Sequence, residues 1–328
     1  MTSPKLDIVA IGDAIVDVIA TCGDDFLATR GLNKGSMRLL DTAEADSLYA
    51  AMGPARETSG GSAANTMAGV AALGGSAGFI GQVADDQLGA IFAHDMVALG
   101  VRFETPPLTG GPPTGRCLIL VTPDAQRTMN TCPGASHELR PHSLDEAMIR
   151  SAAILYLEGY LWGPEQPRAT MLRAAEIAHQ AGRAVAFTLS ESLCIPGRRE
   201  GVHGMIEAGA IDLLFANEDE ARHLTGCADL DSALDALLPK VATLIVTRGA
   251  AGAIGIEQKR RVEVPAAPVA RVVDTTGAGD LFAAGFLAGR CKGHGLERCL
   301  QAGALAAAEV IAHFGARPEV NLMERVKL

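Results

Sequence analysis

The chain has 328 residues, of which 48% are hydrophobic and only 4% aromatic, and its formal net charge is −10. This length suits two domains, or one large α/β domain with an appendage. The acidic balance, the scattered basic residues and the shortage of aromatic side chains for base stacking argue against nucleic acid as a partner. No uninterrupted apolar stretch is long enough to span a bilayer, so we expect no membrane partner.

The seven cysteines are scattered, without a Cys-x-x-Cys pair or a His-rich neighbourhood. An odd number of scattered cysteines, in a chain long enough to form a large hydrophobic core, predicts buried free thiols in a reducing compartment. The same pattern predicts no structural zinc site. Lys5 and Asp7 lie within the first apolar run, which is not the pattern of a signal peptide. We therefore expect a cytoplasmic location.

The N-terminal third is rich in short strand-like segments. Residues 8–12 predict a first strand, and residues 116–121 and 127–131 predict a β-hairpin. Residues 14–20 and 36–40 can pair beside this hairpin. The resulting small sheet is too thin to have a core of its own, so we expect it to pack over a ligand cleft as a lid.

A glycine-rich loop at residues 59–65 opens a predicted helix. The adjacent Gly60 and Gly61 would let a ligand approach the backbone closely, and Asn65 offers both a donor and an acceptor. An ordinary capped helix start explains the same residues.

The C-terminal two-thirds repeats a strand and a helix about every 30 residues. Near-continuous apolar strands indicate a parallel sheet with helices on both faces. Polar residues follow each strand, and ligands of such sheets bind beyond the carboxyl ends of the strands. The predicted strands are residues 153–157, 184–189, 211–215 and 243–247, and two of the helices are residues 169–180 and 231–238.

The most informative segment is Val-Asp-Thr-Thr-Gly-Ala-Gly-Asp at residues 273–280, which leads into a helical pattern. The backbone N–H groups of Gly277, Ala278 and Gly279, together with the helix N-terminus, predict an anion cradle. Asp280 on its rim suits removal of a proton from a hydroxyl that attacks a phosphoryl group. No Walker A sequence is present. The alternative is a tight turn in which Asp280 is only the N-cap.

Five motifs in this order resemble the ribokinase-like (PfkB) family of carbohydrate and nucleoside kinases, over essentially the whole chain. They are the loop at 60–65, the stretches at 81–89, 217–220 and 247–252, and residues 274–280. The resemblance implies an α/β fold of Rossmann-like, ribokinase type: a large, mostly parallel sheet covered by helices on both faces, plus a small β-sheet lid. We expect one such domain over residues 1–328, with a discontinuous lid formed by about 14–41 and 103–131.

The resemblance also implies roles for the nucleotide side of the site. Asp280 looks like the general base and the N–H groups of residues 277–279 like the anion hole. Asn217 and Glu220 resemble a pair that orders Mg²⁺ and its waters beside the ATP phosphates. The alternative is a strand-end cap with a solvated helix start. Thr247, Gly249 and Gly252 match residues that pass close to ATP.

Two further implications concern positive charge. Arg127 resembles a lid arginine that reaches the phosphates on closure, and an exposed hairpin arginine is the alternative. Asp274, Thr276 and the loop around Gly315 fall where many family members hold a monovalent cation, so K⁺ is a possible activator.

For the phosphate acceptor, Asp17 is expected to accept hydrogen bonds from two vicinal hydroxyls. The residues implied to share this site are Asp13, Asp17, Gly60, Gly61, Asn65 and Tyr160. Asp13 departs from the asparagine usual in adenosine-kinase members. A base would need an apolar slot, for which Leu39, Tyr160, Trp162 and Leu193 are candidates; packing in the core or the lid is the alternative for the two aromatics.

Three functions stay open from the sequence. The first is an ATP-dependent kinase of a primary hydroxyl, most like adenosine kinase and acting on the 5′-OH of adenosine or another purine nucleoside, with a free-sugar kinase as the alternative. The second is a dinucleotide-dependent oxidoreductase, although its Gly-x-Gly-x-x-Gly pattern is absent after the first strand. The third is a non-catalytic binding protein. A monomer or a homodimer formed through the lid is expected.

Overall fold

Nine strands of the described residues, 5–190 and 198–328 of this computed structural model, form one large sheet. Its order is β14 (Arg260–Val264), β13 (Ala253–Glu257), β12 (Thr243–Thr247), β11 (Leu213–Asn217), β10 (Ala184–Thr188), β9 (Ala152–Glu158), β1 (Leu6–Ile11), β5 (Ala77–Ile80) and β6 (Val101–Phe103). Neighbours from β12 to β6 pair in parallel, while β13 and β14 are antiparallel at one edge. The predicted mostly parallel sheet is confirmed.

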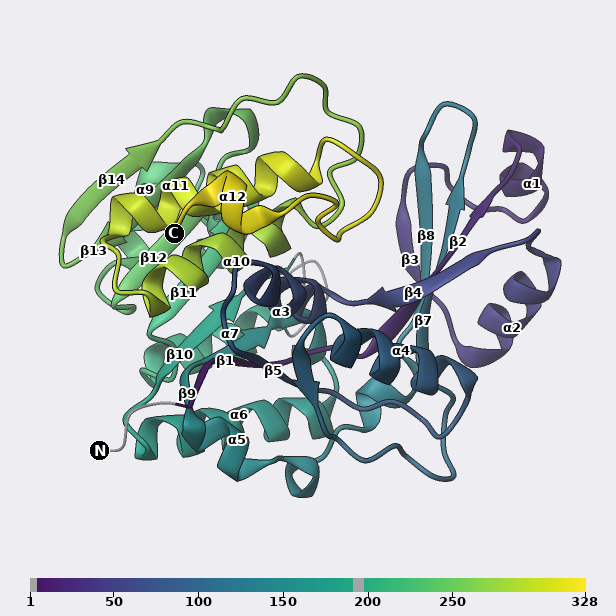
Figure 1. Ribbon diagram of the computed structural model, residues 1–328, viewed down its shortest axis with the longest axis horizontal. Coiled ribbons are helices and arrows are strands. Elements are labelled where there is room, and N and C mark those ends of the chain that lie inside the picture. Colours follow the sequence, from purple (N-terminus) through teal and green to yellow (C-terminus); the bar gives the residue numbers. More distant parts are fainter. Residues whose placement is uncertain (1–4, 191–197) are drawn as a thin grey trace.

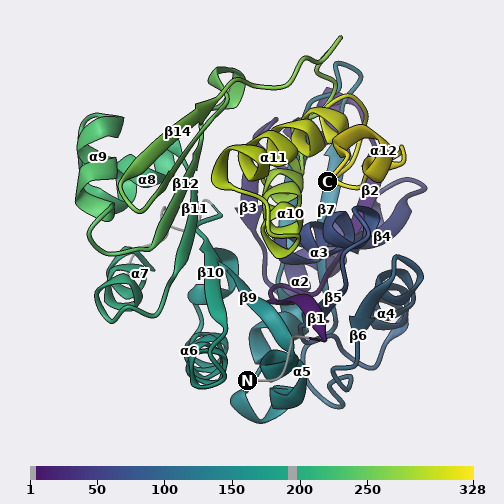
Figure 2. The same cartoon turned by 60° about the vertical axis from the view of Figure 1, so that its left-hand side comes forward.

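Helices cover both faces of this sheet (Figure 2). Alternate residues of β1 point to opposite sides: Ile8 and Ala10 join one core cluster, Val9 and Ile11 the other. Because both faces are buried, the central strands are largely apolar, whereas the edge strand β14 is polar and mostly exposed. One face carries α3 (Ser62–Ala72), α4 (Gln87–Ala98), α10 (Ala278–Cys291), α11 (Leu296–Val310) and α12 (Leu322–Val326); the other carries α5 (Glu146–Ser151), α6 (Glu165–Gln180), α7 (Arg198–Glu207), α8 (Glu218–Thr225) and α9 (Leu230–Leu237).

A second sheet stands beside the first (Figure 1). Its order is β3 (Met37–Leu39), β8 (Arg127–Cys132), β7 (Gly115–Val121), β2 (Ile15–Thr21) and β4 (Arg56–Gly60), and it is accompanied by α1 (Asp24–Thr29) and α2 (Thr42–Ala51). The predicted hairpin is present as the antiparallel pair β7–β8. One face of the sheet joins the main core through residues such as Val18 and Leu118, together with Leu48 of α2.

The lid differs from its predicted bounds of 14–41 and 103–131 in two places. The sequence Arg-Glu-Thr-Ser-Gly of β4 has no strand pattern, yet it pairs with β2 and becomes an edge of the lid. At the other boundary, β6 pairs with β5 of the large sheet, and the lid resumes only at Gly115. At β4, pairing with a neighbouring strand overrides local propensity.

Small residues bring the two helices of the site into close contact. A Cβ atom at Gly69 of α3 would lie 2.7 Å from the Cβ of Ala284 and 2.8 Å from Cδ1 of Leu281, both in α10. Phe286 of α10 packs edge-on against Phe215 of β11, with ring centroids 5.4 Å apart. These contacts fix the start of α10 relative to both α3 and the sheet.

The six cysteines within the described residues are free thiols, and three of them are buried. Cys194 lies outside the described residues. Among the helices that the structure describes, none is long and apolar enough to cross a membrane.

Candidate functional site

The turn before α10 places the backbone N–H groups of Gly277 and Gly279 at the helix N-terminus, while the N–H of Ala278 donates to the carbonyl oxygen of Thr275 at 3.2 Å. Gly277 is the N-cap, with a left-handed φ of 77°, and a Cβ atom there would lie 2.6 Å from the Cβ of Ala316. Only glycine fits this turn without strain. A Cβ atom at Gly279 would meet no described atom within 4 Å, so the backbone there borders open space. The geometry is that of an anion cradle at a helix N-terminus.

Asp280 is not the N-cap of α10, so that alternative is wrong. Its Oδ1 accepts a hydrogen bond from the Ser62 hydroxyl at 2.6 Å, and its Oδ2 accepts one from Nδ2 of Asn65 at 3.0 Å. Burial raises the pKa of Asp280, while these two hydrogen bonds and the charge of Arg317 oppose the rise. The two glycine-rich loops, about 215 residues apart in the chain, therefore meet at this carboxylate.

Asn65 has an unused acceptor at this meeting point. The residue is only 6% exposed, and its Oδ1 has no hydrogen-bond partner among the described residues. A buried amide oxygen without a donor is costly. A ligand hydroxyl is a suitable donor for it.

The loop at Gly60 and Gly61 closes tightly on the end of β1 and on β2. A Cβ atom at Gly60 would lie 2.5 Å from the carboxyl carbon of Asp17. Gly61 has a φ of 94°, and its Cβ would lie 2.2 Å from the carbonyl oxygen of Asp13. The side chain of Asp13 accepts a hydrogen bond from Ser136 at 2.9 Å. The structure thus brings the predicted acceptor residues on β2, α3 and their loops into one place.

Asp17 lies on the lid face opposite the one that α2 covers. Burial raises its pKa to about 6, Arg317 and Arg127 oppose the rise, and Asp280 adds to it. Asp17 thus lies within electrostatic reach of groups from the lid, α10 and the C-terminal segment.

Glu158 at the end of β9 was not assigned a role from the sequence. It is fully buried, and its two carboxyl oxygens each accept a backbone N–H at 2.6 Å, from Asp13 and from Ala63. Burial, and then the nearby charge of Asp13, raise its pKa. Glu158 ties the β1–β2 loop to the first turn of α3. A polar residue at a strand end was the only signal for it in the sequence.

Arg127 of the lid is buried against the loop before α10, so the exposed alternative is wrong. Its side chain is 10% exposed, and it forms a 2.8 Å ion pair with Asp274 and stands 5.5 Å from the ring centre of Phe314. Asp274 also accepts hydrogen bonds from Thr276 and from the backbone N–H of Gly315. The lid therefore already contacts the large domain through a charged pair.

The predicted nucleotide residues line the ends of β11 and β12. Asn217 caps α8: its Oδ1 accepts the backbone N–H of Glu220 at 2.7 Å, and Glu220 accepts the N–H of Asn217 at 2.8 Å. Thr247 ends the neighbouring strand β12. Gly249 and Gly252 have left-handed φ values of 55° and 88°, and a Cβ atom at Gly252 would lie 2.0 Å from the carbonyl oxygen of Val264.

The structure removes one residue from the predicted base slot. Trp162 is 2% exposed and packs against Phe187 at 6.1 Å, within the core on the far side of the sheet, so its assignment to the slot is wrong. Tyr160, in the short 3₁₀ turn Gly159–Trp162, is half-buried. Leu39 is 50% exposed on the edge strand β3. Leu193 lies outside the described residues.

Arg317 is the second site residue that the sequence did not reveal. It follows α11 in an irregular segment and has no motif around it, yet it donates hydrogen bonds to Ala64 and Ser59 on either side of the Gly60–Gly61 turn. Burial lowers its pKa to about 10, and Asp17, Asp280 and Asp95 oppose that change.

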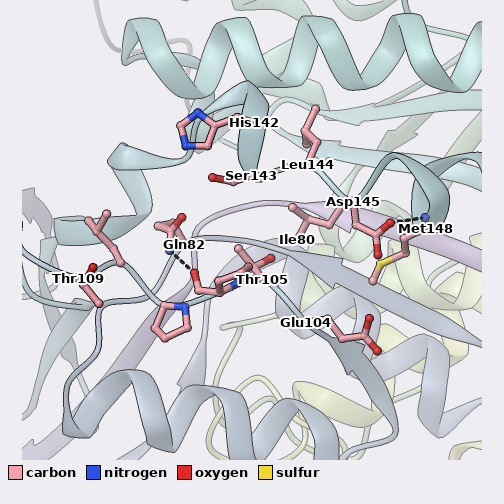
Figure 3. Close-up of a pocket in the computed structure, with 13 residues that line it drawn as sticks. Ile80, Gln82, Glu104, Thr105, Thr109, His142, Ser143, Leu144, Asp145 and Met148 are labelled. Carbon is pink, nitrogen blue, oxygen red and sulfur yellow. Dashed lines mark hydrogen bonds between the residues drawn. The ribbon is translucent and has the colours of Figure 1, made fainter.

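A separate cavity of about 440 Å³ contains none of the predicted site residues (Figure 3). It lies between the loop after β6 and the start of α5, and Gln82, His142 and Asp145 are among its lining residues. Gln82 donates to the carbonyl oxygen of Pro106 and so forms part of the wall.

Comparison with known proteins places the chain in a family. The pfkB family carbohydrate kinase domain matches residues 5–321. The adenosine kinase of Sinorhizobium meliloti is 47% identical, with a TM-score of 0.91 over 98% of this chain and 99% of that one. A probable sugar kinase from Rhizobium etli is 44% identical, with a TM-score of 0.92 over 99% and 98% of the two chains.

A further relative is named for a different substrate from the two proteins above. An ATP-dependent ribose-1-phosphate kinase of Halopiger xanaduensis is 32% identical over 261 residues, which cover 75% of this chain and 78% of that protein. The matched domain spans nearly the whole chain, and the aspartate beside an anion cradle suits phosphoryl transfer. The chain belongs to the pfkB family of carbohydrate kinases and is an ATP-dependent phosphotransferase.

Proposed function

We propose that this protein transfers the γ-phosphoryl group of ATP to the 5′-hydroxyl of adenosine or another purine nucleoside, in purine salvage in the cytoplasm. The observation that carries the proposal is the meeting of Asp280 with Asn65 beside the open N-terminus of α10. It combines a base, an unused acceptor for a ligand hydroxyl and a cradle for a phosphoryl group. The 47% identity to an adenosine kinase supports the nucleoside as acceptor.

In this mechanism Asp280 accepts the proton of the attacking hydroxyl. Its raised pKa brings it closer to the pH at which a general base is efficient. The backbone N–H groups of residues 277–279 stabilise the charge that develops on the phosphoryl oxygens. Asp17 and the Oδ1 of Asn65 hold the other acceptor hydroxyls, which orients the attacking oxygen.

The residues fit Mg²⁺ held through its own waters. Oδ1 of Asn217 and Oε2 of Glu220 accept backbone N–H groups, and no cluster of three metal-binding side chains occurs in the part of the chain that the structure describes. Mg²⁺ usually keeps several waters, so indirect binding near Asn217 and Glu220 leaves the cap intact. The ion would neutralise charge on the ATP phosphates.

The side chain of Asp274 does not fit a monovalent cation in this arrangement. Its carboxylate already pairs with the Arg127 guanidinium and accepts N–H and O–H donors from Thr276 and Gly315. A second positive charge there would be repelled. No step of the mechanism uses K⁺.

The inner face of the lid favours a nucleoside over a free sugar. Ile15, Cys117 and Ile119 form a small apolar cluster, and Cys117 pairs directly across from Asp17 in the lid sheet. A base could lie against this face while Asp17 holds the ribose hydroxyls. Asp13 favours the alternative, because a second carboxylate suits further sugar hydroxyls.

The test compares kcat/KM for adenosine, inosine, guanosine, ribose and fructose, measured by ADP release. We expect adenosine or another purine nucleoside to be the best acceptor. Efficient turnover of a free sugar, with every nucleoside at least about a hundredfold worse, would replace the nucleoside with the sugar and keep the kinase.

Acidic pH is expected to lower kcat/KM for the acceptor. Only ionised Asp17 can accept hydrogen bonds on both oxygens, and its pKa is about 6. Below pH 6, kcat/KM for the acceptor should therefore fall by up to about tenfold per pH unit. The profile of Asp17→Asn should lose the part of this limb that Asp17 contributes, while protonation of Asp280 still lowers kcat at acidic pH. An unchanged limb in that variant would assign it to another group.

The backbone amides of the lid are expected to exchange their hydrogens more slowly when the acceptor binds. Asp17 on β2 pairs with Cys117 on β7, so a ligand held by Asp17 should stabilise the ladder of residues 116–131. Closure would also exclude water from the phosphoryl group. Hydrogen exchange with and without acceptor measures this. Equal protection in both states would show that the lid does not respond to the acceptor.

A further inference from the structure

A short stretch of the C-terminal segment touches both halves of the site. Residues 315–317 lie between α11 and α12, in the yellow segment that runs beside α10 toward the lid in Figure 1. The backbone N–H of Gly315 donates to Asp274 at 2.9 Å, and Ala316 packs against Gly277 of the anion cradle. Arg317 then reaches the acceptor loop.

The contacts of Arg317 surround the Gly60–Gly61 turn. Its Nη1 donates to the carbonyl oxygen of Ala64 at 2.9 Å, and its Nη2 donates to the carbonyl oxygen of Ser59 at 3.1 Å and to the Ser59 hydroxyl at 3.2 Å. Ser59 lies in β4 of the lid, next to its last residue, and Ala64 lies in the first turn of α3. One guanidinium therefore spans the turn on which the acceptor site depends.

Other contacts also hold the turn: Gly60 pairs with Ile15 in the lid sheet, and the carbonyl oxygen of Gly61 accepts the N–H of Asn65 at 2.9 Å. Arg317 is the side chain that contacts the backbone on both sides of it. Glycines at 60 and 61 restrict the backbone less than any other residues, and Gly61 already adopts a left-handed φ. On the opposite side, the N–H of Ser59 donates to the carboxylate of Asp95 in α4 at 2.9 Å. Ser62 and Asn65, which orient Asp280, follow the turn directly.

We propose that Arg317 is a positioning residue for phosphoryl transfer, because it fixes the Gly60–Gly61 turn and so holds Ser62 and Asn65 in place against Asp280. This inference rests on the proposed function. The planar fork of arginine can serve two carbonyl oxygens at once, whereas lysine supplies a single point charge. The charge of Arg317 also lies near the carboxylates of Asp17 and Asp280 and favours their ionised forms.

The experiment uses Arg317→Gln and Arg317→Lys in the full chain, with Arg298→Gln as a matched control. Arg298 also donates its Nη2 to two backbone carbonyl oxygens, of Val326 and Lys327 at 2.5 and 2.8 Å, and neither of these two residues belongs to the site. We expect Arg317→Gln to lower kcat/KM for the acceptor by about 10²-fold, as small misplacements of reacting groups do, with KM for ATP unchanged. Arg317→Lys should recover part of the loss and Arg298→Gln should match the wild type.

A purely structural role predicts a different result. It would lower the melting temperature and the active fraction, with kcat per active enzyme and KM for the acceptor both unchanged in Arg317→Gln, and that outcome overturns the proposal. Wild-type kinetics in Arg317→Gln would overturn it as well. If Arg317→Gln does not fold, Arg317→Lys alone decides: kcat/KM per active enzyme below the wild type supports the proposal, and a wild-type value overturns it. A wild-type enzyme that phosphorylates no nucleoside or sugar would refute the proposed function instead.

Discussion

Replacing Asp280 with asparagine is expected to lower kcat by about 10²–10⁴-fold, the usual contribution of a general base. Asparagine keeps the size of the side chain and can still bond to Ser62 and Asn65, whose groups now meet Asp280 at 2.6 and 3.0 Å. Binding of ATP and of the acceptor should therefore stay close to wild type. Steady-state kinetics and calorimetric binding of each ligand separate these two effects.

The control for Asp280→Asn is Glu297→Gln. Glu297 is an exposed acidic residue in the first turn of the neighbouring helix α11, so its replacement removes a similar charge from a similar helix position outside the site. Its kcat should equal that of the wild type. A wild-type kcat in Asp280→Asn would show that another group, or the substrate itself, takes the proton.

Gly277→Ala is expected to reduce kcat by about 10²–10³-fold, as loss of an anion-stabilising donor does. The new Cβ would lie 2.6 Å from the Cβ of Ala316, so the turn must move. Its backbone N–H groups would then no longer point at the transferring phosphoryl group. The left-handed φ of 77° adds a cost of roughly 1–2 kcal/mol to folding. Kinetics together with thermal unfolding measure both consequences.

Gly293→Ala isolates the backbone strain. Gly293 has a similar φ of 80°, but a Cβ atom there would meet no described atom within 4 Å. This variant should lose stability and keep wild-type kcat. If the two variants lose the same small amount of activity, the N–H groups at the start of α10 do not stabilise the transferring group.

Local sequence pattern was enough for the main architecture. Buried parallel strands are apolar on both faces, so the runs at β9, β10, β11 and β12 stand out, and β12 has the predicted bounds of residues 243–247. Gly277 and Gly61 could also be singled out, because left-handed turns and close approaches select glycine. Asp280 was identifiable because it follows such a turn at a helix start.

The tertiary structure decided the features that depend on partners far away in the chain. Glu158 accepts a hydrogen bond from the N–H of Asp13, 145 residues away in the chain, and Arg317 donates one to the carbonyl oxygen of Ala64, 253 residues away. No local pattern surrounds Arg317, and Glu158 was marked only as a polar residue at a strand end. The polar strand β4 exists because β2 pairs with it. Asn217 and Glu220 form the N-terminal cap of α8, which the local sequence pattern could suggest. The burial of Arg127 against Asp274, in contrast, depends on contact between the lid and the large domain. Sequence periodicity reports which face of an element is buried. Which residues meet across elements is determined by the packing of the whole chain, and there the sequence alone gives no signal.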